Sequence, residues 1–244
     1  MTELKGLVDF HSHIIHRMDD GSRSLEESLS MIKASADMGV EHIVLTPHFY
    51  ARNDDPVTFL ARRERRYNEL MESLPEGSPV LHLGAEVEYF DGIVQMESLR
   101  DLRIRGSKCL LIEMPFAKWT DRNLSDILAL SRQKSYRVVI AHIERYLHCV
   151  DYDDLVSLVR QGVMIQSNAE NFINLLSRKR AVSMLDEGLI HFIGSDSHGM
   201  AMRSPNLDKA MKYIEKKLGN NIVSQISGLS LHMLGDVKET VTSV

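Results

Sequence analysis

The stretch LVDFHSH, residues 7–13, is a short apolar run that ends in two histidines. Similar apolar runs recur along the chain, and most of them end in histidine or carboxylate residues. Seven runs stand out: Leu7–Phe10, His42–Thr46, Val80–Val87, Cys109–Met114, Arg137–Ala141, Val163–Gln166 and Ile190–Gly194. Several are nearly continuous in Val, Ile and Leu, which is typical of parallel strands that are covered on both faces.

Helical patterns lie between these runs. Ser24 precedes the pattern of residues 25–39, and Glu27 follows three positions later, which predicts a capping box, with Gly39 placed to end the helix. Further helices are expected over Asp121–Ser135, Asp151–Gln161 and Asn171–Glu187. Strands that alternate with helices indicate parallel β/α units. Seven units favour an α/β fold, a distorted (β/α)7 barrel forming one domain over residues 1–244, and a doubly wound open sheet is the alternative.

The composition is that of an ordinary globular protein, with 43% hydrophobic and 26% charged residues. A net charge of −5 and the lack of a basic tail argue against nucleic-acid binding. The two cysteines, Cys109 and Cys149, are too few for a disulfide framework, so a reducing compartment is expected. The sequence has no apolar run long enough to span a bilayer and no signal-peptide pattern. We therefore expect a cytoplasmic protein that does not insert directly into membranes.

Candidate metal ligands lie at the carboxyl ends of six of the seven runs. In α/β folds these strand ends meet at one face, so residues far apart in sequence converge on one pocket. His11 and His13 are two positions apart, so both side chains point to the same face of a strand, and Asp196 and His198 repeat this spacing. The other candidates at the strand ends are His48, Glu86, Glu113 and His142. Imidazole and carboxylate together suit Zn²⁺, Mn²⁺ or Fe²⁺.

Other residues of the same types fit this pattern less well. His42 and His191 begin their runs, at the wrong end of a barrel, and Glu88 is interpreted as structural because Glu86 lies nearer the start of the strand-end loop. A lone histidine is more often a hydrogen-bonded structural residue than a ligand. This is our interpretation of His16, His82, His148 and His232. The sixth run, which continues as MIQSNAEN, offers no evident ligand.

Motifs of covalent catalysis are missing from the sequence. Neither Cys109 nor Cys149 has an arginine six residues later, as the signature of cysteine phosphatases requires. The sequence also lacks a GxSxG elbow, a P-loop and a GxGxxG motif. A hydrolase with several metal ions, acting on a phosphomonoester through an activated water, is the reading that fits best.

The motifs DFHSH, TPH, GAE, IEMP, AHIER and SDSH cover almost the whole chain and resemble the signatures of the polymerase-and-histidinol-phosphatase (PHP) superfamily. The opening HSHIIHRMDDGSRSLEESLSM is similar, more narrowly, to the bacterial PHP-type protein tyrosine phosphatases of capsule and exopolysaccharide loci. Ile15 stands where leucine is usual in that group.

The resemblance implies a site with two or three divalent metal ions, with manganese expected and iron, cobalt or zinc as alternatives. It implies one ligand set of His11, His13, Glu86 and Asp196. It implies a second set of Glu86, Glu113 and His142, and a third of Asp20, His48 and His198. It also implies that Arg145 and Arg203 bind the phosphate. From the residues alone, Asp20 would be interpreted as a turn residue before Gly21.

The substrate that the resemblance implies is phosphotyrosine on the tail of a bacterial tyrosine kinase that controls polysaccharide export. A small-molecule phosphomonoesterase such as histidinol phosphatase is the first alternative. An amidohydrolase-like metalloenzyme is the second, although no lysine lies at a strand end to be carboxylated as a metal bridge. A non-catalytic regulator with a vestigial barrel is the third, and the full ligand set argues against it.

Overall fold

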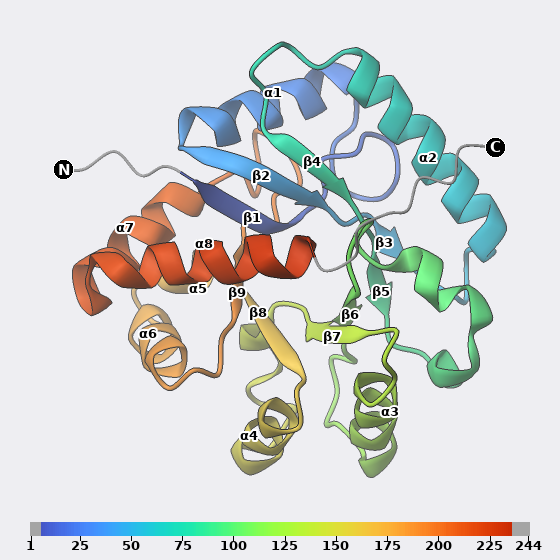
Figure 1. Ribbon diagram of the computed structural model, residues 1–244, viewed down its shortest axis with the longest axis vertical. Coiled ribbons are helices and arrows are strands. Elements are labelled where there is room, and N and C mark those ends of the chain that lie inside the picture. The colour runs from blue at the N-terminus through green and yellow to red at the C-terminus, as the bar shows by residue number, and fades with distance from the viewer. Residues whose placement is uncertain (1–5, 236–244) are drawn as a thin grey trace.

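Parallel strands form the centre of the computed structural model, which describes residues 6–235 (Figure 1). The expected domain of residues 1–244 therefore extends at both ends beyond the described residues. The strands are β1 Leu7–Ser12, β2 Val40–Leu45, β3 His48–Phe49, β4 Val80–Leu83, β5 Glu86–Glu88, β6 Cys109–Glu113, β7 Arg137–Ile140, β8 Met164–Asn168 and β9 Phe192–Gly194. Every pairing among them is parallel, as the β/α alternation predicted.

The strands follow one another around a curled sheet in chain order. One sheet has the order β1-β2-β4 and the other has the order β3-β5-β6-β7-β8-β9. The two ends of the curl meet where Ser12 forms a parallel bridge to Ser197, and where the Asp196 N–H donates to the His11 carbonyl at 2.8 Å. Because β3 continues β2 and β5 continues β4, the strands occupy seven positions. This confirms the distorted (β/α)7 barrel, and the doubly wound open sheet was wrong.

The distortion lies in the third run, which was expected as one strand over Val80–Val87. It breaks at Gly84 into β4, which pairs with β2, and β5, which pairs with β6. The segment around Ile104 fills the space beside β4, where the Arg105 N–H donates to the Leu83 carbonyl at 2.7 Å. A Cβ atom at Gly84 would lie 3.1 Å from Ile104 Cγ1, so a larger residue there would push this segment away.

Helices surround the strands (Figure 1). They are α1 Leu25–Asp37, α2 Pro56–Glu72, α3 Asp121–Ser131, α4 Tyr152–Arg160, α5 Ala169–Ile173, α6 Arg178–Asp186, α7 Leu207–Leu218 and α8 Asn220–Leu234. Three short 3-10 helices are η1 Ile93–Gln95, η2 Glu97–Leu102 and η3 Ile143–Tyr146. Helix α4 agrees with its prediction to within one residue at each end, whereas α3 ends four residues earlier than predicted.

Two sequence predictions about the helices were wrong. The helix expected over Asn171–Glu187 is two helices, because Asn174 adopts an extended backbone with ψ of 128° and ends α5. The capping box at Ser24 is only half formed. Ser24 Oγ accepts the Glu27 N–H at 3.2 Å, but the Glu27 carboxylate accepts the N–H of Arg23, at 2.9 Å, instead of that of Ser24.

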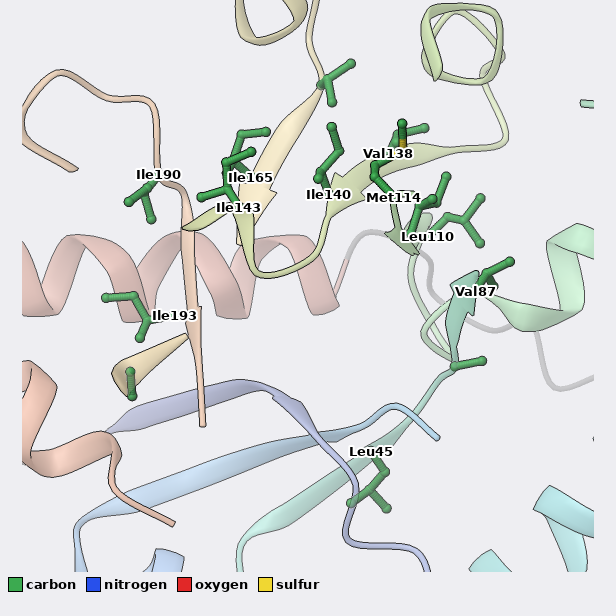
Figure 2. Close-up of a cluster of buried hydrophobic side chains, with 14 of the residues drawn as sticks. Leu45, Val87, Leu110, Met114, Val138, Ile140, Ile143, Ile165, Ile190 and Ile193 are labelled. Atoms are coloured by element: carbon green, nitrogen blue, oxygen red, sulfur yellow. The ribbon is translucent and has the colours of Figure 1, made fainter. Parts of the chain in front are cut away.

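Two apolar cores hold the barrel. The larger lies between the strands and the helices, and Figure 2 shows part of it, including Leu45, Ile140 and Ile193. The smaller fills the barrel interior, where the rings of Phe10 and Phe192 stack with centroids 3.9 Å apart.

Helix α8 closes the amino-terminal end of the interior. It contributes Met233 and Leu234 to the smaller core, and the carbonyl of Met233 accepts a weak hydrogen bond from the Cys109 thiol at the start of β6. The opposite end, where the strands finish, is left for polar residues. Among residues 6–235, no helix is long and apolar enough to cross a membrane.

Candidate metal centre

The structure brings all nine predicted ligands together at the carboxyl ends of the strands. Eight of their side chains are at most 10% exposed, and Asp20, which is 70% exposed, stands at the rim. The ligands come from β1, the loop after it, β3, β5, β6, the residues after β7, and the loop after β9. The strand-end rule therefore predicted the convergence correctly, including Glu86 on the far side of the break between β4 and β5.

The first group of donors joins the two ends of the curled sheet. Nε2 atoms of His11 and His13, both on or just after β1, lie 3.0 Å apart. Glu86 Oε2 is 3.2 Å from each of these nitrogens, and Asp196 Oδ1 is 3.6 Å from that of His11 and 3.4 Å from that of His13. The alternation of β1 places both imidazoles on one face, as the two-residue spacing predicted.

The second group surrounds Glu86 from the other side. His142 Nε2 lies 2.7 Å from Glu86 Oε1 and 3.4 Å from Glu113 Oε1. His48 Nδ1 is 3.0 Å from Glu86 Oε2 and 3.9 Å from Glu113 Oε2. Glu86 therefore faces both groups: Oε2 lies beside His11, His13 and His48, and Oε1 lies beside His142. His142 has a left-handed backbone, with φ of 30°, which turns the chain sharply from β7 into η3.

The third group lies at the rim. Asp20 Oδ1 is 3.4 Å from His198 Nε2 and 3.7 Å from His48 Nε2. His13 also offers a donor atom to this group, and the four donor atoms lie within 4.8 Å of one another. Asp20 was expected only from the family resemblance. It lies on an exposed loop, whereas most of the other ligands are buried at strand ends.

Divalent metal ions fit these donors. Within residues 6–235, three groups of histidine and carboxylate donors could each hold an ion. Glu86 Oε2 and His48 Nδ1 are buried, and although they lie 3.0 Å apart, neither forms a hydrogen bond of acceptable geometry within residues 6–235. A buried polar atom without a partner is costly, so a native protein usually supplies one. Imidazole nitrogen and carboxylate oxygen are the donors that Mn²⁺, Fe²⁺ and Zn²⁺ accept.

Side chains behind the ligands hold the imidazoles in place, and the sequence analysis missed them. Asp19 Oδ2 lies 2.7 Å from His13 Nδ1, on the side of the ring away from the cluster. Gln166, at the end of the sixth run, places its Oε1 3.3 Å from His11 Nδ1 and accepts the backbone N–H of His142 at 2.6 Å. Asp9 accepts the backbone N–H of Ser195 at 2.7 Å and so ties β1 to the strand-end loop after β9. For Asp9 and Gln166, a polar residue inside an otherwise buried strand was the available signal, whereas Asp19 lies in a turn outside the strands.

The charges of the cluster depend on one another. Burial alone would raise the pKa of Asp19, but the neighbouring His13 lowers it to about 2. Burial alone would lower the pKa of His142, but the charge of Glu86 raises it to about 9. A metal ion needs the imidazole of His142 in its neutral form, so protons and metal ions would compete for this residue.

Two arginines cover the cluster. Arg145 Nη2 lies 2.5 Å from Asp196 Oδ2, and a guanidinium nitrogen of Arg203 contacts the same oxygen. Their side chains are 33% and 40% exposed, so the guanidinium groups reach solvent. A cavity of about 560 Å³ opens beside them, lined in part by Asn168 and Asn171. Both predicted arginines thus stand at the open side of the ligand cluster.

The residues interpreted as structural lie outside the three donor groups. Glu88 forms an ion pair with Arg52 at 2.5 Å. The remaining histidines for which contacts are resolved have ordinary partners. His16 contacts Glu69 at 3.0 Å, His42 contacts His82 at 3.0 Å, and His191 Nδ1 accepts the Ile165 N–H at 3.2 Å.

Comparison with known proteins gives this arrangement a family. The profile described as "Capsular polysaccharide synthesis, CpsB/CapC" matches residues 7–230. The chain belongs to the CpsB/CapC family. Tyrosine-protein phosphatase CpsB of Streptococcus agalactiae serotype III is 30% identical over 234 residues, which cover 90% of this chain and 94% of that protein. Tyrosine-protein phosphatase YwqE of Bacillus subtilis is 26% identical, with coverage of 88% and 87%.

Solved structures show the same fold in this family. The chain superimposes with a TM-score of 0.81 on a solved structure whose description covers two proteins, YwqE from Bacillus subtilis and CpsB from Streptococcus pneumoniae. That description calls them unique metal-dependent tyrosine phosphatases. The identity is 23%, and the match covers 95% of this chain and 96% of that one. A phosphotriesterase homology protein from Escherichia coli matches with a TM-score of 0.54 and 11% identity, covering 96% of this chain and all of the other. A similar fold therefore also occurs in a protein of very different sequence.

Proposed function

We propose that this protein is a metal-dependent protein tyrosine phosphatase, a phosphoric monoester hydrolase that acts in capsule or exopolysaccharide synthesis in the cytoplasm. The observation that carries the proposal is a recessed cluster of histidines and carboxylates with two arginines on its open side. The relatives in the CpsB/CapC family that bear the name tyrosine-protein phosphatase support it.

We assign the metal ligands in three sets that share the cluster. The first is His11, His13, Glu86 and Asp196, the second is Glu86, Glu113 and His142, and the third is Asp20, His48 and His198. His48 also faces the second set, 3.0 Å from Glu86. Two or three Mn²⁺ ions are proposed, with iron, cobalt or zinc as alternatives. When bound, such ions supply a water that is deprotonated near neutral pH and neutralise phosphate charge.

The chain's own residues bind and orient the substrate. Arg145 and Arg203 both contact one oxygen of Asp196, and a phosphoryl oxygen is a better partner for these planar guanidinium groups. We propose that both arginines turn to the phosphate when substrate binds. Asp19 keeps His13 in the tautomer that presents Nε2 to the cluster. Neither Cys109 nor Cys149 takes part, because Cys109 lies in the barrel interior next to α8 and Cys149 is buried.

Because the donor cluster is buried below the rim of the site, it favours phosphotyrosine over phosphoserine as substrate. The donors closest to Glu86 are almost wholly buried, so a phosphate must enter past the rim to reach them. The long and rigid side chain of tyrosine carries its phosphate further from the peptide backbone than serine does. Phenolate is also the better leaving group, with a pKa of about 10.

The proposed partner is the phosphotyrosine-bearing tail of a bacterial tyrosine kinase. A flexible tail can reach a site built on loops at a barrel rim, and its binding is readily reversed. The net charge of −5 would repel an acidic tail at long range, so attraction must come locally from the metal ions and the two arginines. Binding should therefore weaken as the salt concentration rises.

The test compares kcat/KM of the Mn²⁺-loaded protein on a phosphotyrosine peptide, a phosphoserine peptide and histidinol phosphate. We expect the phosphotyrosine peptide to be the best substrate. If histidinol phosphate is preferred by a wide margin, the protein is a small-molecule phosphatase and the kinase-tail assignment is wrong. If none is hydrolysed by protein with a full metal content, the phosphatase proposal itself is wrong.

A further inference from the structure

Phe116 is an exposed aromatic residue beside the candidate metal centre. It lies three residues after the proposed ligand Glu113, in the segment that leaves β6, and its side chain is 60% exposed. A single exposed apolar side chain needs no explanation by itself, but the ring of Phe116 also lies against the imidazole of His142, a proposed metal ligand. We propose that Phe116 determines specificity by packing against the aromatic ring of the substrate. This inference rests on the proposed phosphatase function.

The contacts of Phe116 place it next to the proposed metal ligand His142. Its ring is nearly parallel to the imidazole of His142, with an interplanar angle of 15° and centroids 6.4 Å apart. It also contacts the ring of Tyr146, at 5.3 Å, and Tyr146 directly follows Arg145 in η3. Among the groups proposed to meet the phosphate, His142 is the one that Phe116 contacts, so an aryl ester whose phosphate reaches His142 would bring its ring towards Phe116.

The ring of Phe116 is exposed but held in position. Tyr146 beneath it is fully buried and packs on Trp119, with centroids 5.5 Å apart. The Trp119 Nε1–H donates to the Pro115 carbonyl at 3.3 Å, and the Trp119 N–H donates to the Cys149 carbonyl at 2.8 Å. The segment that carries Phe116 is thus fixed at both sides, so little side-chain freedom is lost when a ligand packs on it.

The chemistry of this surface selects an aryl group. Aromatic rings attract one another at centroid distances of about 4.5–7 Å beyond the effect of buried area. The phosphate, by contrast, is held by charge and contributes equally to any phosphomonoester. Met202, which is 78% exposed beside His198 and Arg203, is another apolar side chain near the cluster. A flexible methionine packs on many shapes and discriminates less between them.

The experiment measures binding rather than turnover, so that the leaving group has no effect. Mn²⁺-loaded protein is titrated by calorimetry with phenylphosphonate and with methylphosphonate, which share the anion and differ in the ring. The wild type should bind phenylphosphonate more tightly. Phe116→Ala should weaken phenylphosphonate binding about 3- to 10-fold and leave methylphosphonate binding unchanged. Phe116→Tyr should restore the ring preference, and Phe116→Leu should restore only part of it.

Two further variants locate the effect. Leu176→Ala, at a 95% exposed apolar position in the loop after α5, is the matched control and should keep the ring preference. If Met202→Ala removes the preference while Phe116→Ala does not, the inference is wrong. Equal affinity of the wild type for the two phosphonates also overturns it. If the wild type with its metal bound takes up neither phosphonate, the proposed function fails as well, and the two failures are thereby distinguished.

Discussion

Asp19 Oδ2 lies 2.7 Å from Nδ1 of His13, and the pair is almost completely buried. The same Asp19 oxygen accepts the backbone N–H of His48 at 2.8 Å, so one carboxylate positions two proposed ligands. A carboxylate behind a metal-binding histidine fixes the ring and makes it a stronger donor.

We expect Asp19→Asn to weaken metal binding about 10- to 100-fold, because the amide lacks the charge that supports His13. Metal affinity measured by competition with a chelator tests this. Asp37→Asn removes a carboxylate of the exposed pair with Lys33 and is the matched control. Unchanged affinity in Asp19→Asn would mean that His13 does not need its partner.

Arg145→Ala should lower kcat about 100-fold or more while the protein keeps its metal, because a preorganised charge that stabilises the transition state is lost. Steady-state kinetics on a phosphotyrosine peptide and elemental analysis of the same sample give the two readouts. Arg132→Ala is the control, because this exposed arginine at the end of α3 donates to Gln161 and contacts none of the proposed ligands in the structure. Wild-type kinetics in Arg145→Ala would place this residue outside the catalytic machinery.

Protein purified without chelator should contain more than one equivalent of divalent metal, since three groups of donors are present among residues 6–235. Treatment with EDTA should abolish phosphatase activity and lower the melting temperature, because the buried donors lose their common partner. Elemental analysis and thermal denaturation before and after chelation test both points. A metal content near zero with full activity would contradict the assignment.

Cys109→Ser and Cys149→Ser should each keep substantial activity, because both thiols are buried and neither belongs to the three donor groups. Activity is normalised to the folded, metal-loaded fraction, since a hydroxyl in the barrel interior at Cys109 lowers stability. Loss of turnover in a folded and metal-loaded variant would identify a thiol nucleophile.

His82 should make the protein less stable in acid, independently of the metal centre. Burial, together with the nearby His42, lowers its pKa from 6.5 to about 4 in the folded state. The unfolded chain therefore takes up a proton first, and the stability contributed by neutral His82 is present above pH 6.5 and is lost as the pH falls towards 4. The free energy of unfolding of His82→Gln should depend less on pH than that of wild type in this range. His148→Gln, at an exposed position, is the control, and parallel curves for His82→Gln and wild type would contradict the prediction.

Much of the candidate site could be predicted because its residues are tied to strand ends. The apolar runs placed the ends of β1, β6 and β7, and parallel strands carry these ends to one face whatever the intervening sequence is. The prediction held even for Glu86, although a break at Gly84 moves it to a separate strand, because β5 resumes the same course after the break.

Residues whose roles depend on partners far along the chain could not be predicted in this way. Asp19 and Asp20 are adjacent in a turn, and local sequence does not reveal which one faces the cluster and which one supports it. Gln166 gains its role only where β8 lies beside β7 and within reach of His11. The break at Asn174 was missed because the helical periodicity continues through it, while contacts of α5 with α7 decide where α5 ends.

Helix α8 has a consequence for synthesis of the chain. The contact between Cys109 and Met233 joins residues 124 positions apart, and His11 meets Asp196 across an even longer stretch of the chain. As the chain leaves the ribosome, the apolar cluster around Phe10 cannot pack against Met233 and Leu234 until α8 has emerged. The barrel interior can therefore be completed only once α8 has been synthesised. A nascent chain that stops before α8 would expose the barrel interior to chaperones and proteases, and one that also stops before Asp196 would lack a ligand of the first metal group.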